Sequence, residues 1–185
     1  MDSTSESLLD RVGRGEESAW QLFAATYQPM IRHWCRVRGL QECDIEDVAQ
    51  SVLIALHKAM EQFTYDPTKG KFRGYLKRIT DREINRHVAR GSKQPLAASD
   101  KLEGAAATTY WDELFHATLL NAALRTLQQS LPEKQWRVFD LVWVQSVPVQ
   151  EIVESEGVSP GWIAQVKCRC IQRLKRELTF LQGEM

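Results

Sequence analysis

Apolar residues recur every three or four positions through most of the 185-residue chain. No segment alternates apolar and polar residues for long enough to indicate a β-strand. In the first half this pattern predicts helices over residues 5–14, from residue 16 to at least residue 34, over 45–62 and over the basic segment 70–87. The sequence therefore predicts an all-α fold.

The expected core of the first half combines aromatic and aliphatic rows. Its residues are Trp20, Phe23, Tyr27, Ile31 and Trp34, then Val48, Val52, Leu53, Leu56 and Met60, then Phe72, Leu76 and Ile79 with Glu83 or Ile84. Asp44 is the predicted N-cap of the third helix. The cations of the fourth helix are expected to point outward.

A polar, Ala-rich stretch separates two predicted domains. Residues 91–109 (GSKQPLAASDKLEGAAATT) contain no large aromatic residue and are predicted to be a flexible linker. The domains are then residues 1–90 and 110–185, two small helical bodies. In the second body the expected core residues are Leu114, Leu120, Leu124, Leu127, Trp136, Phe139, Leu141 and Val142.

The segment 147–178 has the start, turn and stop signals of a helix-turn-helix. Gly157 suits the end of a first helix with Val149, Ile152 and Val153 on its apolar side. Ser159 is the predicted cap of the second helix, and Pro160 fits its first position. The second helix is predicted to bury Ile163, Val166, Cys170, Leu174 and Leu178.

The opposite face of this second helix holds the candidates for DNA contact. Residues near the start of such a helix reach base edges, and later cations meet phosphates. The predicted set is Ser159, Trp162, Gln165, Lys167, Arg169 and Arg173, with Trp162 and Gln165 reading bases and the three cations on the backbone. Partial burial of the Trp162 ring against the first helix is an equal alternative.

Charge is distributed unevenly along a chain whose formal net charge is zero. Residues 1–66 carry 6 Lys and Arg against 11 Asp and Glu, whereas residues 67–90 carry 8 against 2 and residues 157–178 carry 5 against 1. Two basic islands of this kind are typical of phosphate-binding surfaces, because local cations release counterions from a polyanion. Solvated helix faces would give the same count.

Composition narrows the remaining classes of protein. The start, MDSTSESLLDR, is acidic where a secretory signal is basic, and there is no long apolar run, so we expect a cytoplasmic protein without a membrane span. The four cysteines are expected to be reduced. His33, Cys35, Cys43 and His57 match no zinc spacing, so neither a metal nor another cofactor is predicted.

Taken together, the helix DIEDVAQSVLIALHKAM, the segment FTYDPTKGKFRGYLKRITDREINRHVAR, a linker and the terminal helix-turn-helix resemble an extracytoplasmic-function (group IV) sigma factor of the sigma-70 family. The phrases YDPTKGKFRGYL and VSPGWIAQVKCRCIQRLKREL are similar to such factors of planctomycetes. The resemblance implies that residues 1–90 bind core RNA polymerase and open the minus-10 element. It also implies that residues 110–185 read the minus-35 element.

The resemblance also implies roles for single residues. Asp44, Asp47 and Gln50 would dock on the beta-prime coiled coil, although Ser51 stands where an acidic residue is common. The minus-10 set is Tyr65, Lys69, Lys71, Arg73, Tyr75, Lys77, Arg78 and Arg82. Tyr75 replaces the usual Trp, and Arg82 and Arg86 stand where Asn and Asp are common. Such a surface needs cations for phosphates and rings for unstacked bases.

Partners implied by the resemblance are promoter DNA and core polymerase, through its beta-prime coiled coil and its beta flap. An anti-sigma factor is a further partner of the family, although no residue identifies one here. No nucleophile, base and orienting residue occur at an interpretable spacing, so we do not expect an enzyme. Two alternatives stay open: a helix-turn-helix regulator that does not replace sigma, and a metal enzyme built on His33, Cys35, Cys43 and His57.

Overall fold

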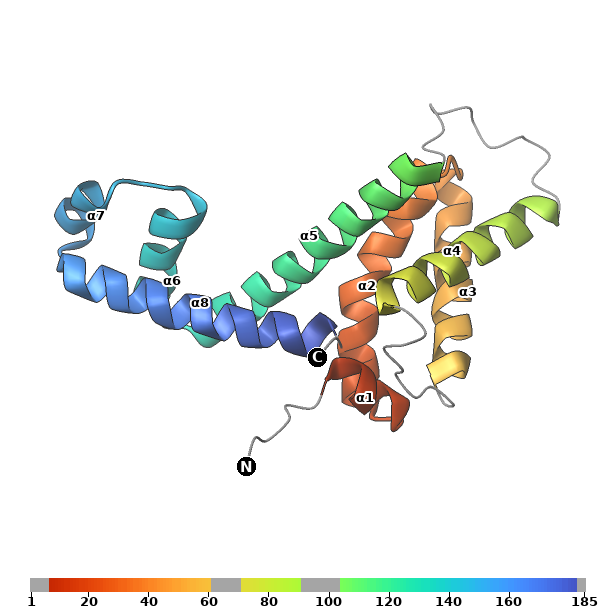
Figure 1. The fold of residues 1–185 in the computed structure, drawn as a ribbon, viewed down its shortest axis with the longest axis horizontal. Helices are drawn as coiled ribbons and strands as arrows, with labels where there is room; N and C mark the ends of the chain where they lie inside the picture. The colour runs from red at the N-terminus through yellow and green to blue at the C-terminus, as the bar shows by residue number, and fades with distance from the viewer. Residues whose placement is uncertain (1–6, 61–70, 91–103, 183–185) are drawn as a thin grey trace. The chain divides into compact units, whose positions relative to one another are not determined.

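The computed structural model describes residues 7–60, 71–90 and 104–182, and in these ranges the chain is helical without strands (Figure 1). The predicted all-α class is confirmed. The chain divides into two compact units, Met1–Leu119 with Phe180–Met185, and Leu120–Thr179. In the described ranges no helix is both long and apolar enough to cross a bilayer.

The first unit begins with the short helix α1 (Leu8–Gly13) and the longer helices α2 (Glu17–Val37), α3 (Glu42–Met60) and α4 (Phe72–Ala89). A capping box starts α1, since Ser7 Oγ accepts a hydrogen bond from the Asp10 amide while Asp10 accepts one from the Ser7 amide. Figure 1 shows α2, α3 and α4 as the body of this unit.

Aromatic rings fill the interface between α2 and α4. Phe23 and Tyr27 of α2 lie with ring centroids 5.9 and 5.7 Å from that of Phe72 on α4. These separations suit edge-to-face pairs. The predicted aromatic row is thus in the core, except that Trp20 is only half-buried against His57.

The start of α5 (Gly104–Ser130) also belongs to the first unit. Trp111 is 1% exposed, its indole nitrogen donates to the Arg73 carbonyl at 2.9 Å, and its ring meets that of Trp34 at 5.1 Å. Phe115 stacks on Tyr27, whose hydroxyl donates to the Leu181 carbonyl. Residues from both ends of the predicted second domain therefore complete the first core.

This arrangement departs from the predicted boundaries. Residues 104–109 of the predicted linker are helical, because Ala is the best helix former and three of these residues are Ala. Residues 91–103 lie outside the described ranges. The predicted domain boundary at residue 110 falls inside α5. The most buried residues of α5 are not the predicted leucines but Ala107, Trp111, Phe115, Leu119, Ala122, Ala123 and Leu127. Of the predicted row, only Leu127 is fully buried.

The second unit is built from the end of α5, α6 (Glu133–Phe139), the π-helical turn η2 (Asp140–Val144), α7 (Val149–Glu156) and most of α8 (Pro160–Gln182). Val138, Ile152 and Ile163 form a small core where α6, α7 and α8 meet. An ion pair of 2.9 Å between Arg137 and Glu156 joins α6 to α7. The predicted inner residue Val149 is instead 42% exposed.

Candidate nucleic-acid interface

A tight turn connects α7 to α8. Gly157 ends α7 with φ 61° and ψ 43°, a left-handed conformation that glycine adopts without steric cost. The Ser159 hydroxyl accepts a hydrogen bond from the Trp162 amide at 3.2 Å, so it caps α8 as predicted. The turn therefore fixes how the first residues of α8 leave α7.

Trp162 and Gln165, the predicted base-reading residues in the first turns of α8, differ in their exposure to solvent. Trp162 is half-buried and packs on the core of Val138, Ile152 and Ile163, which is the alternative raised by the sequence. Gln165 is exposed. Lys167 and Arg169 are exposed as well. A polar, basic surface thus surrounds a partly buried ring.

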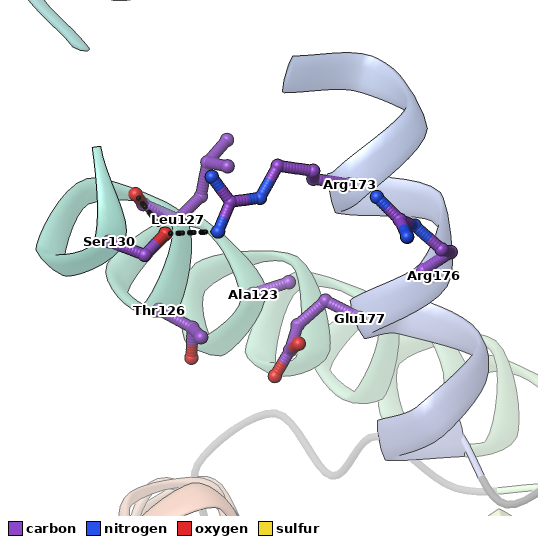
Figure 2. Close-up of a pocket in the computed structure, with 7 residues that line it drawn as sticks. All are labelled: Ala123, Thr126, Leu127, Ser130, Arg173, Arg176 and Glu177. Atoms are coloured by element: carbon purple, nitrogen blue, oxygen red, sulfur yellow. Dashed lines mark hydrogen bonds between the residues drawn. The ribbon is translucent and has the colours of Figure 1, made fainter. Parts of the chain in front are cut away.

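Arg173 has a partner within the second unit. Its guanidinium donates to the Ser130 hydroxyl of α5 at 3.0 Å (Figure 2). Arg176 and Glu177 line the same hollow of about 350 Å³ between α5 and α8. Burial raises the pKa of the Glu177 carboxyl, while a hydrogen bond from Thr126 lowers it in part. Arg173 thus helps to hold α8 against α5, and its predicted phosphate contact stays a prediction.

Two cations of α4 are engaged inside the first unit. Arg73 forms an ion pair of 2.9 Å with Asp112 of α5. Lys77 pairs with Asp81 at 2.7 Å and lies 5.0 Å from the centre of the Trp34 ring. The expectation that the cations of this helix all point outward is therefore wrong for these two, because carboxylates one turn away and on α5 draw them inward.

Asp81 is the centre of this inner network. It also accepts hydrogen bonds from Trp34 Nε1 at 2.9 Å and from Arg38 at 2.9 Å. Both partners lie at the end of α2 or just after it, so one carboxylate on α4 ties the two elements together. Hydrogen bonds from charged donors are the stronger ones, so this network stabilises the position of α4.

The outer face of α4 keeps the rest of the predicted cluster. Lys71, Arg78 and Arg82 are exposed, and Tyr75 is half-exposed beside them. Steps of three and four residues place these side chains along one helical stripe. Tyr65 and Lys69, the remaining members of the predicted set, lie outside the described residues.

The polar face of α3 holds the third predicted set. Asp47 and Gln50 are exposed, and Ile54, one further turn along, is 56% exposed. Asp44 is half-buried and lies 3.5 Å from His87 of α4. Asp44 is not the N-cap, because α3 starts two residues earlier and the Asp44 amide already donates to the Gln41 carbonyl. Sequence reasoning missed Ile54, although its spacing from Asp47 and Gln50 could have revealed it.

The residues of the hypothetical metal set have separate partners. His33 Nε2 lies 2.8 Å from the Tyr110 hydroxyl, and His57 packs on Trp20. Burial raises the pKa of the Cys35 thiol to about 12, so it stays protonated, whereas Cys43 is exposed. Within the described ranges no three His, Cys, Asp or Glu residues gather as metal ligands would.

The comparison with protein families identifies one region of the chain. Residues 23–94 match the family described as sigma-70 region 2, a span that includes α2, α3 and α4. No curated protein matches the sequence. Residues 23–94 are therefore similar to sigma-70 region 2, a match that covers the helices of the first unit's body.

Proposed function

We propose that this protein is an extracytoplasmic-function sigma factor, similar to those of planctomycetes, that acts in the cytoplasm. In this proposal it binds core RNA polymerase, opens the minus-10 element with its first unit and reads the minus-35 element with its second. It contributes binding and promoter opening, while polymerase supplies the chemistry.

The observation that carries the proposal is that residues 23–94 expose two surfaces, a polar face of α3 and a basic outer face of α4. The polar face of α3, with Asp47, Gln50 and exposed Ile54, supports docking on the beta-prime coiled coil. The outer face of α4 places Lys71, Arg78 and Arg82 beside the ring of Tyr75. Cations beside a ring suit a melted strand, because it presents phosphates and unstacked bases together.

The second unit supports a minus-35 reader. A capped helix that follows a tight turn resembles the recognition element of a helix-turn-helix, with Gln165, Lys167 and Arg169 exposed on its first half. In this arrangement Gln165 contacts a base edge, and the two cations contact phosphates. The beta flap is the proposed polymerase partner of this unit.

Transcription from a promoter library with purified core polymerase tests the proposal. The full chain should yield discrete transcripts that core polymerase alone does not start. A helix-turn-helix regulator that does not replace sigma would start none, and that result would overturn the proposal in favour of this second candidate.

Binding to core polymerase tests the α3 face separately. Asp47→Ala should weaken the complex with core polymerase by about tenfold, since a charged contact to a partner contributes on the order of 1 to 2 kcal/mol. Glu113→Ala, an equal change of charge at an exposed position of α5, is the matched control and should bind normally. Equal binding by both variants would refute the docking role of Asp47.

A further inference from the structure

The hollow of about 350 Å³ between α5 and α8 lies outside the surfaces used in the proposed function. Its volume is within the range of small-ligand pockets, about 300 to 1,000 Å³. It is lined by Ala123, Thr126, Leu127 and Ser130 of α5 and by Arg173, Arg176 and Glu177 of α8 (Figure 2). All of these residues belong to the second unit, so one compact body forms the whole hollow.

Arg173 is held in place at the edge of this hollow. Its guanidinium donates to Ser130 Oγ at 3.0 Å, and that hydroxyl in turn donates to the Leu127 carbonyl at 2.9 Å. The bond to Ser130 uses only part of the donor capacity of a guanidinium group. The other N–H donors remain available to a ligand, and a side chain that is already fixed loses less conformational freedom when it binds one.

Arg176 brings a second guanidinium to the hollow. Residues three apart are neighbours on a helix surface, and Figure 2 shows Arg173 and Arg176 both extending from α8 toward α5. Arg176 is exposed, and no hydrogen bond or ion pair to another described residue engages its guanidinium. Arginine binds phosphate through paired donors. Two guanidinium groups match a phosphate monoester, which carries a charge of about −1.5 to −2 near pH 7.

Glu177 is the one carboxyl group among the residues that line the hollow. Burial raises the pKa of this carboxyl, whereas the hydrogen bond from Thr126 and the charge of Arg173 lower it. Two arginines outweigh a single carboxyl group in either protonation state. The lining therefore keeps a net positive charge.

We propose that this hollow binds a small phosphate monoester. Arg173 and Arg176 hold the phosphate, and the apolar surface of Ala123 and Leu127 contacts the organic group. The site needs neither polymerase nor promoter, so it goes beyond the proposed function. The competing occupant is a phosphate of duplex DNA, because Arg173 belongs to the predicted minus-35 set. DNA is less suited, since Arg173 turns toward Ser130 and Glu177 repels the neighbouring phosphates that a duplex brings.

A nuclear magnetic resonance titration of the full-length protein with phenyl phosphate tests the site. The Nε–H signals of Arg173 and Arg176 should shift and saturate, with a dissociation constant of about 1 mM or below. Arg173→Gln with Arg176→Gln should weaken binding by about tenfold, because two charge-assisted contacts are lost. Benzoate, which has the same ring and a single charge, should bind more weakly than phenyl phosphate.

Two further variants keep the test independent of the fold. Arg176→Gln alone breaks no contact between described residues and should still weaken binding by about fivefold. Glu177→Gln removes the opposing carboxylate and should bind phenyl phosphate at least as tightly as the unmodified protein. The charge-matched control, Lys134→Gln with Lys175→Gln, changes two exposed positions of the second unit and should keep the affinity. Circular dichroism should show all variants folded.

Several results would overturn the proposal. They are the absence of saturable binding up to about 10 mM phenyl phosphate, equal affinity of Arg176→Gln and the control, benzoate binding as tight as phenyl phosphate, and loss of binding in Glu177→Gln.

Fluorescence anisotropy with a labelled DNA duplex separates the two sources of phosphate. If the unmodified protein does not bind phenyl phosphate but its duplex affinity depends on Arg173 and Arg176, the hollow contacts DNA and the proposal is wrong. If phenyl phosphate binding depends on both arginines while the protein starts no transcripts with core polymerase, the ligand site stands and the sigma role is wrong.

Discussion

Replacement of Trp111 by alanine tests whether the start of α5 is part of the first core. The side chain is 1% exposed, contacts Trp34 and donates to the Arg73 carbonyl at 2.9 Å. Removing a buried Trp side chain typically costs about 3 to 5 kcal/mol, because apolar contacts are lost and a cavity remains. The hydrogen bond accounts for about 1 kcal/mol of this cost.

The cost can be read from urea unfolding followed by circular dichroism. With a slope near 2 kcal/mol per molar urea, a loss of about 4 kcal/mol lowers the midpoint of the first unit by about 2 M. Trp111→Phe keeps most of the ring and loses the indole donor, so its cost should be nearer 1 kcal/mol.

Thr109→Ala, at an exposed position two residues earlier, provides the control. Its effect should stay within about 0.5 kcal/mol, as for most surface substitutions. If Trp111→Ala shifts the midpoint no more than Thr109→Ala does, α5 does not pack on α2 and α4, and the reasoning about this core is refuted.

Three further predictions concern single side chains. Ser159→Ala should lower the free energy of unfolding of the second unit by about 1 kcal/mol, measured by urea unfolding, because the Trp162 amide loses its cap; an unchanged midpoint would contradict this. The pKa of Glu177 in the folded protein is raised above its unfolded value of 4.5, so stability should decrease as the pH rises from 4.5 to the folded pKa. Glu177→Gln should flatten this part of the pH profile of thermal unfolding. An identical profile for the variant would argue against burial of the carboxyl. In native protein at pH 8, exposed Cys43 and Cys168 should react with a thiol reagent, whereas Cys43→Ser with Cys168→Ser, which keeps only the buried thiols Cys35 and Cys170, should react slowly; rapid reaction of this double variant would contradict their burial.

Local signals made the helices and the α7–α8 turn predictable from the sequence. The three- and four-residue spacing of apolar positions follows from helix geometry, and Gly157 with Ser159 encodes a stop and a start through backbone preference and capping. The exposed face of α4 followed from the same periodicity at Arg78 and Arg82. These features depend on neighbours within a few residues, so a single sequence contains them.

The features that could not be predicted depend on contacts between residues far apart in the sequence. Arg73 turns toward Asp112 and Trp111 toward the Arg73 carbonyl, both across more than 35 positions of the chain. No periodicity identifies such partners. The helical start of α5 was missed because a short Ala-rich stretch gains stability from packing of later residues such as Phe115 on Tyr27.

Permanganate probing of unpaired thymines tests the central claim, promoter opening by this chain, most directly. With core polymerase and a promoter selected from the library, the full protein should make thymines of the minus-10 element reactive. Arg78→Gln with Arg82→Gln should reduce that reactivity, since both exposed cations lie on the face assigned to the strand. Thymines that stay unreactive with the unmodified protein, although it occupies the promoter together with polymerase, would contradict the account.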